Sequence, residues 1–216
     1  MRAYFVKTPY FIKFIFKNWI WSFSKNKKTI YLTFDDGPTP ELTTWVLDLL
    51  FKFNAKATFF CIGKNISEYP EIFKAILKND HAVGNHTNNH LNGWKTSADL
   101  YLENCNEAAK TIQQFNNSTV QYNLKLFRPP YGKLTLNQSK KIREKSYKII
   151  MWDVLSADFD TKISKEKCLK NIRKNTKNGS IVVFHDSIKA REKIKFVLPK
   201  VLEYYTEKGY AFDKII

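Results

Sequence analysis

Cysteine is scarce in this chain, and its scarcity excludes two classes of protein. Only three cysteines occur among 216 residues, Cys61, Cys105 and Cys168, and no two of them have CxxC spacing. A small disulfide-rich domain needs more paired cysteines, and a zinc ribbon or a thioredoxin-like redox site needs the CxxC pair. An odd number leaves at least one free thiol. We therefore expect these side chains to act as small buried hydrophobic groups.

Long apolar runs are also absent. Residues 10–21 form the most apolar stretch, but Lys13 and Lys17 interrupt it, and it is shorter than the about 20 residues needed to cross a bilayer. No small-residue cleavage site follows, so we expect no cleaved signal peptide and a location in the cytoplasm or at the inner membrane face. Two fates stay open for the basic, aromatic N-terminal segment, residues 1–28: peripheral contact with an anionic membrane, or packing of a helix on the domain.

Acidic residues are few compared with basic ones. The chain has 36 basic and 20 acidic residues, a net charge of +16, and its first 34 residues contain no acid. Such asymmetry suggests an anionic neighbour, whether lipid headgroup, phosphate-bearing substrate or nucleic acid, although a general preference for Lys and Asn explains it equally well. Because no zinc knuckle, RNP-like motif or Arg-rich helix accompanies the charge, we expect no nucleic-acid partner.

Short β-rich runs alternate with helical patterns over residues 29–216. The length and the 44% hydrophobic content suit one α/β domain. Alternation of this kind is typical of βα units around a parallel sheet or barrel. The expected strands are residues 29–34, 57–62, 81–84, 124–128, 147–152 and 180–185, and the expected helices are residues 40–53, 70–79, 97–116, 135–146, 164–177 and 191–208.

Polar side chains gather where the predicted strands end. In parallel α/β folds, the carboxyl ends of the strands meet at one edge, where substrates bind. The residues at these ends are Asp35 and Asp36, His86 and His90, Arg128, Asp153 and Asp158, and His185 and Asp186. We expect one polar site at this edge, with Asp153 as a structural residue or loop cap. His81, in a turn before a strand, is expected to be solvated.

The sequence His86-Thr87-Asn88-Asn89-His90 holds two of the four histidines. On a helical turn, the HxxxH spacing would place both imidazoles on one face. One carboxylate from the pair Asp35-Asp36 would complete a 2-His-1-carboxylate set, which binds a divalent metal and leaves positions open for water and substrate. The second carboxylate would remain available as a base.

Five motifs, in order, resemble those of a known family. They are TFDDGP at residues 33–38, HTNNH at 86–90, RPPYG at 128–132, the segment 152–159, and IVVFHD at 181–186. Across roughly residues 29–213, this order resembles the NodB-homology polysaccharide deacetylases, carbohydrate esterase family 4. The resemblance implies a distorted (β/α) barrel, a catalytic domain over residues 29–216, and metal-dependent removal of N-acetyl or O-acetyl groups from sugars.

The resemblance also implies roles for individual residues. Asp36, His86 and His90 correspond to the ligands of one divalent metal, with Zn²⁺ favoured, although the same donors suit other transition metals. Asp35 corresponds to the general base for a water whose pKa the metal lowers. Arg128 is expected to lie near Asp35, orienting it and keeping it ionised.

The other motif residues correspond to groups that act on the oxyanion and the departing amine. The backbone N–H of Tyr131 would help to hold the oxyanion. His185 would be the general acid, and Asp158 is the candidate partner that would hold it cationic.

Two departures from the family pattern affect the expected substrate groove. Phe159 stands where the family usually has Trp, and Val183 stands where it usually has Leu. Trp152 would compensate for the missing stacking surface only if it faces the groove. Together with Pro130, these three are the expected substrate-contacting residues.

These implications predict a metal-dependent amidohydrolase acting on an N-acetylated amino sugar in a polysaccharide, an oligosaccharide or a lipid-linked saccharide. The N-terminal segment and the missing signal peptide favour a lipid-linked or nucleotide-linked sugar, whereas the family more commonly implies a secreted enzyme acting on peptidoglycan or chitin. The alternative is a non-catalytic basic binding protein for an anionic polymer on the same fold. The sequence leaves the oligomeric state open.

Overall fold

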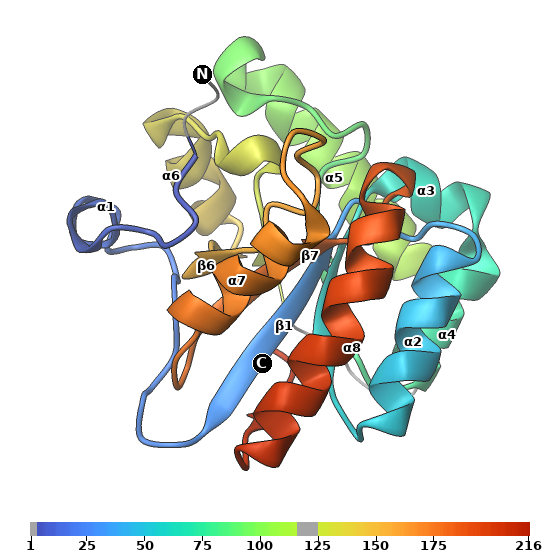
Figure 1. The fold of residues 1–216 in the computed structure, drawn as a ribbon. Helices are drawn as coiled ribbons and strands as arrows, with labels where there is room; N and C mark the ends of the chain where they lie inside the picture. The colour runs from blue at the N-terminus through green and yellow to red at the C-terminus, as the bar shows by residue number, and fades with distance from the viewer. Residues whose placement is uncertain (1–3, 116–124) are drawn as a thin grey trace.

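A parallel sheet organises the computed structural model, which describes residues 4–115 and 125–216 (Figure 1). The strand order is β5-β4-β3-β2-β1-β7-β6, and β8 pairs with the start of β1. The strands are β1 (Thr29–Asp35), β2 (Ala57–Cys61), β3 (Ala82–Asn85), β4 (Leu126–Phe127), β5 (Lys148–Ile149), β6 (Val154–Leu155), β7 (Ile181–His185) and β8 (Ala211–Phe212). The predicted single-domain α/β fold is confirmed.

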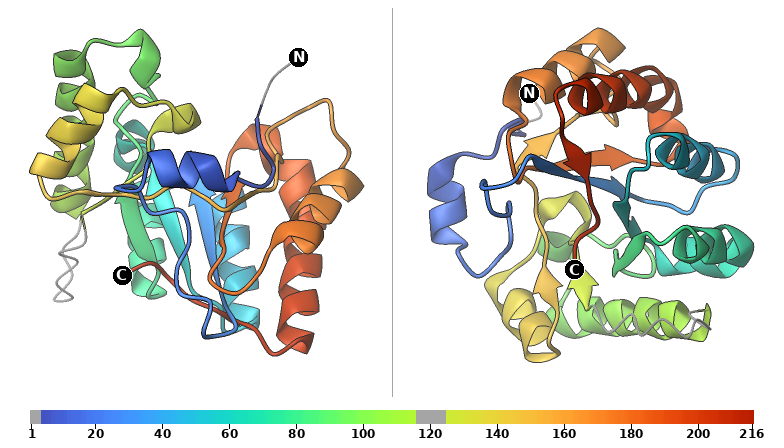
Figure 2. Two further views of the ribbon diagram at one scale, coloured as in Figure 1. Left: turned by 90° about the vertical axis from the view of Figure 1, so that its left-hand side faces the viewer. Right: turned by 90° about the horizontal axis from the view of Figure 1, so that it is seen from below.

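Helices lie around the sheet, as the view from below shows (Figure 2, right). They are α1 (Tyr10–Ile15), α2 (Leu42–Lys52), α3 (Gly63–Glu68), α4 (Pro70–Lys78), α5 (Ala98–Phe115), α6 (Leu136–Glu144), α7 (Lys165–Asn175) and α8 (Arg191–Glu207), with 3₁₀ turns η1 (Gly93–Lys95), η2 (Pro130–Gly132) and η3 (Ile188–Ala190). All six helices predicted between residues 40 and 208 are present. Residue 116 of the predicted helix 97–116 and residue 124 of the predicted strand 124–128 lie outside the described residues.

The structure differs from the prediction in four elements. The strand expected over residues 147–152 ends at Ile149, because the backbone beyond it pairs with the N-terminal segment instead: the Met151 N–H donates to the Ile20 carbonyl over 2.7 Å. A separate strand, β6, follows. Helix α3 and strand β8 were not predicted, because six and two residues are too few to display a periodic pattern.

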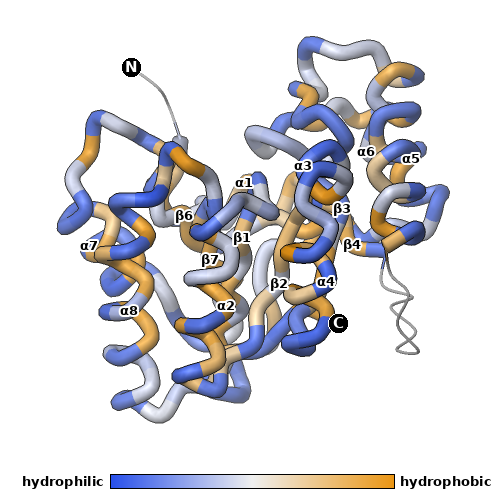
Figure 3. Tube along the Cα trace, turned by 90° about the vertical axis from the view of Figure 1, so that its right-hand side faces the viewer, coloured by the Kyte–Doolittle hydropathy of each residue, from blue (hydrophilic) through white to orange (hydrophobic). Residues whose placement is uncertain are grey.

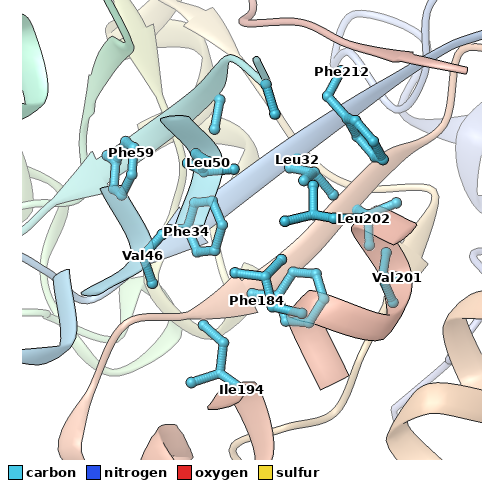
Figure 4. Close-up of a cluster of buried hydrophobic side chains, with 14 of the residues drawn as sticks. Leu32, Phe34, Val46, Leu50, Phe59, Phe184, Ile194, Val201, Leu202 and Phe212 are labelled. Atoms are coloured by element: carbon cyan, nitrogen blue, oxygen red, sulfur yellow. The ribbon is translucent and has the colours of Figure 1, made fainter. Parts of the chain in front are cut away.

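Strand β1 has one face in the apolar core and the other toward the inside of the barrel, and this alternation positions the site. Its side chains Leu32 and Phe34 are fully buried in the core between the sheet and the outer helices (Figure 4). There the Phe34 ring stacks on Phe59 and Phe184, with centroids 4.9 and 5.9 Å apart. Apolar residues line the strands and the sheet-facing sides of α2 and α8 (Figure 3). Because side chains alternate along a strand, Asp35 points to the opposite face from Phe34.

The N-terminal segment, described from residue 4 to residue 28, lies at the gap between the edge strands β5 and β6 (Figure 2). Lys7 forms an antiparallel bridge with Val154, and Ile20 forms a parallel bridge with Ile150. Trp19 and Trp21, each 8% exposed, pack in the cluster around Tyr101 and Phe127. Asp153, expected to be structural, accepts hydrogen bonds from Lys7, Lys13 and Ser180, and so ties this segment to the domain.

One face of α1 remains exposed. Tyr10, Phe11, Phe14 and Ile15 all project their apolar side chains into solvent. Of the two fates expected for the N-terminal segment, packing on the domain is seen for the two tryptophans. Membrane contact through the exposed residues of α1 stays a prediction. Within residues 4–115 and 125–216, no helix has the length and apolar character needed to cross a bilayer.

His81 is buried, so the expectation that it is solvated was wrong. Its side chain lies against the Phe59 ring at a centroid distance of 5.4 Å, and its Nδ1 accepts the Ala57 N–H over 3.2 Å. This acceptor role requires the neutral ring. Burial, with a smaller contribution from Lys56, lowers the pKa of His81 to about 4.

This burial predicts a pH-dependent loss of stability. The unfolded chain binds a proton at His81 near the ordinary pKa of about 6.5, whereas the folded chain resists it down to about pH 4. The stabilisation is therefore complete above pH 6.5 and is lost as the pH falls toward 4, by about 2 kcal/mol between pH 7.5 and pH 5. The test is urea unfolding at pH 7.5 and at pH 5. His81→Gln keeps a hydrogen-bond acceptor, and its free energy of unfolding should fall between these pH values by about 2 kcal/mol less than that of wild type. Equal losses would contradict the assignment.

Candidate active site

Five of the polar residues predicted at the strand ends line one cavity of about 770 Å³, whereas the other four, Arg128, Asp153, Asp158 and Asp186, are buried outside its lining. Its lining includes Asp35 at the end of β1, His86 and His90 after β3, and His185 at the end of β7. Strand β7 is next to β1 and only β2 separates β1 from β3, which explains how residues up to 150 positions apart meet. The expectation of one polar site at the carboxyl edge of the sheet is therefore met.

Asp36, His86 and His90 form a group that could hold a metal. Their candidate ligand atoms all lie within 4.8 Å of one another. The Asp36 Oδ1 lies 3.1 Å from the His90 Nε2 and 3.6 Å from the His86 Nε2. Two ligand atoms of a tetrahedral zinc, at the usual bond lengths, are roughly 3.3 Å apart. The spacing therefore fits one divalent ion shared by the three residues.

The surroundings of the two imidazoles prepare them as ligands through Nε2. The His86 Nδ1 lies 2.7 Å from the Arg128 carbonyl, an acceptor that requires the proton on Nδ1 and so leaves the Nε2 lone pair free. The His90 Nδ1 lies 3.1 Å from the Tyr131 hydroxyl. Burial lowers the pKa of His86 to about 4, so this ring is neutral at pH 7. Although burial opposes ionisation of Asp36, the hydrogen bond from His90 and the nearby imidazoles hold its pKa well below the usual range.

The HxxxH motif does not lie on a helix, so the predicted helical turn was wrong. Residues 86–90 form a loop in which Thr87 and His90 have positive φ, 63° and 55°. Asparagine side chains hold this loop: Asn85 Oδ1 accepts the Thr87 N–H over 2.8 Å, and Asn104 Oδ1 accepts the N–H groups that follow. These side-chain acceptors replace the helical carbonyls, so the backbone can aim both imidazoles at Asp36.

Left-handed backbone recurs around the cavity. Asp36, Thr87, His90, Tyr131 and Ala157 all have φ between 55° and 81°. Each is costly for a non-glycine residue, and such strain concentrates where side chains must be aimed for function. At Asp36 it resolves a geometric problem, because consecutive strand residues would otherwise point to opposite faces. The turn at Asp36 itself, rather than Gly37-Pro38 alone, brings both carboxylates to the cavity.

Gly37 and Asp186 fix the loop that carries the two carboxylates. The buried Asp186 carboxylate accepts the Gly37 N–H over 3.1 Å and the Thr43 hydroxyl over 2.5 Å. A Cβ on Gly37 would lie 2.1 Å from the Asp186 Oδ2, so only glycine fits. The sequence placed Asp186 at the strand end but gave no sign of this supporting contact.

Asp35 is 4% exposed and is bound by Arg128, as the resemblance implied. The Arg128 Nη1 lies 2.6 Å from the Asp35 Oδ1 and 2.7 Å from the Thr33 hydroxyl. Its other nitrogens donate to the carbonyls of Ile150 and Met151, and its guanidinium lies 4.1 Å from the Phe60 ring centroid. Arg128 is thus fixed on every side, and its charge compensates Asp35 inside the barrel.

His185 and Asp158 form a second ion pair across the cavity. The His185 Nδ1 lies 2.7 Å from the Asp158 Oδ1, and the His185 N–H donates to the Asp158 Oδ2 over 2.8 Å. Burial alone would lower the pKa of His185, but the charge and hydrogen bond of Asp158, with smaller effects from Asp36 and Asp35, raise it to about 10. The ring is therefore cationic at neutral pH, with Nε2–H left to donate.

Trp152, Phe159, Val183 and Tyr131 line the cavity, so Trp152 does face the groove. Pro130 does not: it is buried, and the preceding Pro129 lines the cavity instead. The expectation that Pro130 contacts substrate is corrected on this ground, because Pro130 begins the 3₁₀ turn η2 and turns inward.

Sequence reasoning missed one aromatic wall of the cavity. Tyr4 lines it, packing edge-on against Phe159 at 5.5 Å and donating from its hydroxyl to the Asp160 Oδ2 over 2.8 Å. Phe159 in turn packs edge-on against His185 at 5.0 Å. No motif marks Tyr4; only the pairing of the N-terminal segment with β6 brings it there.

Comparison with known proteins gives consistent matches. The polysaccharide deacetylase family model matches residues 23–150, a range that ends before Asp158 and His185. A peptidoglycan-N-acetylglucosamine deacetylase of Bacillus cereus is 37% identical over 193 residues, 89% of this chain and 88% of that protein.

Solved structures extend the likeness to the whole fold. The Bc1960 peptidoglycan N-acetylglucosamine deacetylase superposes with a TM-score of 0.86 at 31% identity, covering 96% of this chain and 95% of that one. BA3943 of Bacillus anthracis, a CE4 family pseudoenzyme, superposes with a TM-score of 0.78 at 26% identity, covering 91% of this chain and 66% of that one. The expected distorted (β/α) barrel is confirmed.

Proposed function

The chain belongs to the polysaccharide deacetylase family, carbohydrate esterase family 4, and on that premise we propose that it is a metal-dependent deacetylase that hydrolyses the N-acetyl group of an amino sugar. One observation carries this proposal. A candidate metal triad, a buried carboxylate held by arginine and a histidine held cationic by aspartate all meet at the same cavity. Metal-assisted hydrolysis of an amide uses these three kinds of group: a metal site, a base for the attacking water and an acid for the departing amine.

Asp36, His86 and His90 would hold the metal, and their N,N,O donor set favours Zn²⁺ while also suiting other transition metals. When bound, such an ion polarises a carbonyl and lowers the pKa of a water. The spacing of the three donors and the fixed Nδ1 contacts of both imidazoles support this assignment.

The remaining side chains divide the proton transfers between them. Asp35 would accept the proton of the attacking water, and Arg128 would keep its carboxylate oriented. The Tyr131 N–H would stabilise the oxyanion. On the other side of the cavity, His185 would give its Nε2 proton to the departing amine, since an unprotonated amine is a poor leaving group. Val183 would contact the acetyl methyl group.

The alternative, a non-catalytic basic binding protein, has one observation in its favour, the net charge of +16. The fold also occurs in a pseudoenzyme. Retention of base, candidate ligands and acid around one cavity argues for turnover, because a binding protein has no need for their joint alignment.

Metal content tests the proposal apart from activity. Purified protein should bind about one zinc per chain and release acetate from N-acetylglucosamine oligomers; chelation should abolish the release, and added zinc should restore it. His86→Ala should lose metal affinity by more than about tenfold, because the ion loses one of three protein ligands. His81→Gln, which changes a buried histidine outside the triad, should keep full stoichiometry. A His86→Ala protein that retains metal would remove His86 from the ligand set.

A further inference from the structure

Lysine side chains dominate the charge at the mouth of the cavity. Lys95, Lys133 and Lys189 all line it, and Lys95 and Lys189 are exposed. They follow β3, β4 and β7, so they stand on both sides of β1 and its carboxylates. Within residues 4–115 and 125–216, none of the three lysines forms an ion pair.

One of the two acids of the cavity is compensated by a buried arginine. Among the described residues, the carboxylates in its lining are Asp35 and Asp36. Arg128 compensates Asp35 at 2.6 Å, whereas Asp36 lies against two imidazoles and is the carboxylate that a shared metal would compensate. His185 adds a further positive charge, balanced by Asp158 behind it. The three lysines therefore outnumber Asp36, the remaining acid among the described lining residues, and give the mouth a net positive potential.

Two of the lysines, Lys95 and Lys133, lie where η1 packs against the chain that follows η2. A Cβ on Gly93 would lie 2.4 Å from the Lys133 carbonyl, so η1 and the chain after η2 touch at backbone distance. Gln138, which completes the capping box of α6, donates to the Gly93 carbonyl over 2.9 Å. Lys133 Nζ lies 5.1 Å from the Trp94 ring centroid, a cation–π contact that positions its stem. These contacts hold Lys95 and Lys133 at the cavity, and neither ammonium group forms an ion pair with a described residue.

We propose that the substrate carries an anionic group, a carboxylate or a phosphate, beside the acetamido sugar, and that Lys95, Lys133 and Lys189 bind it. The inference rests on the proposed deacetylase function and narrows its substrate class. A neutral oligosaccharide would leave three ammonium groups at the cavity mouth without partners. An anionic one would gain charge-assisted hydrogen bonds from them.

A matched pair of sugars isolates the charge. One is a peptide-free tetrasaccharide of alternating N-acetylglucosamine and N-acetylmuramic acid; the other is its methyl ester, which has nearly the same shape without the carboxylate charges. At low salt, the zinc-loaded protein should bind the acid roughly 5- to 50-fold more tightly in calorimetry, with kcat/KM for acetate release favouring it similarly. The preference should shrink as salt is raised, because exposed charges are screened.

Lysine variants distinguish binding by the three cavity lysines from an effect of the net charge of the whole protein. The triple variant Lys95→Gln, Lys133→Gln, Lys189→Gln should bind acid and ester equally. The control triple Lys52→Gln, Lys110→Gln, Lys170→Gln removes the same charge from exposed helix positions that do not line the cavity, and should keep the preference. A second pair, UDP-N-acetylglucosamine and methyl N-acetylglucosaminide, distinguishes phosphate from carboxylate as the recognised group.

The outcomes distinguish this inference from the proposed function. Acetate release with equal binding of acid and ester, and of both members of the second pair, would keep the function and overturn the lysine assignment. Tighter binding of the anionic sugar, without acetate release from any probe, would support the lysines and overturn the function. Loss of the preference in the control triple would attribute it to net charge and also overturn the assignment.

Discussion

Replacing Asp35 with Asn is expected to lower kcat for acetate release by about 100- to 10,000-fold, the usual contribution of a general base. The amide keeps the size of the side chain but cannot accept a proton from water. Arg128 fixes the orientation of Asp35 from 2.6 Å away, so the loss should reflect chemistry rather than displacement. The measurement is steady-state acetate release from N-acetylglucosamine oligomers by the zinc-loaded protein.

Folding and metal content must be checked in the same variant, because Asp35→Asn leaves the buried Arg128 charge without its counter-ion. Thermal unfolding and elemental analysis provide both checks. Asp48→Asn, the same chemical change on the exposed face of α2, should retain wild-type kcat. An Asp35→Asn protein with a full complement of zinc and wild-type turnover would show that Asp35 is not the base.

Strand periodicity predicted where the site would form. An apolar run ending in acids placed Asp35 at the carboxyl end of β1, and similar endings placed His86, Arg128 and His185 at the same edge. The local sequence carries this information, because a parallel sheet gathers its strand ends. Pairing Arg128 with Asp35, 93 positions away, came only from the family resemblance, since spacing alone does not indicate which strand ends face each other.

The predictions that were wrong or missing also have physical reasons. HxxxH spacing fits a helix, but Asn85 and Asn104 supply side-chain acceptors that hold residues 86–90 in a strained loop. Turn-forming asparagines next to the histidines were the signal for this outcome. Tyr4 depends on a bridge between Lys7 and Val154, a long-range contact with no local pattern. Burial of His81 likewise follows from packing against Phe59.

The second large effect is expected at His185. In His185→Gln the departing amine loses its proton donor, so kcat should fall by about 100- to 10,000-fold, while zinc binding persists because His185 is outside the triad. His81→Gln supplies the matched control, a histidine removed from the interior of the fold rather than the cavity, and should leave kcat within about twofold. Wild-type turnover in His185→Gln would assign the acid to another group.

The pH profile tests Asp158 through its effect on His185. A general acid works in its protonated form, so activity falls as the pH rises through its pKa. Asp158 raises the pKa of His185 to about 10, and this places the alkaline limb well above neutrality. Asp158→Asn removes the largest raising influence, and the limb of kcat against pH should move down by more than about one unit. A purely structural Asp158 would lower kcat at every pH and leave the limb unmoved, so the shift itself distinguishes a residue that holds His185 cationic from one that only supports the loop.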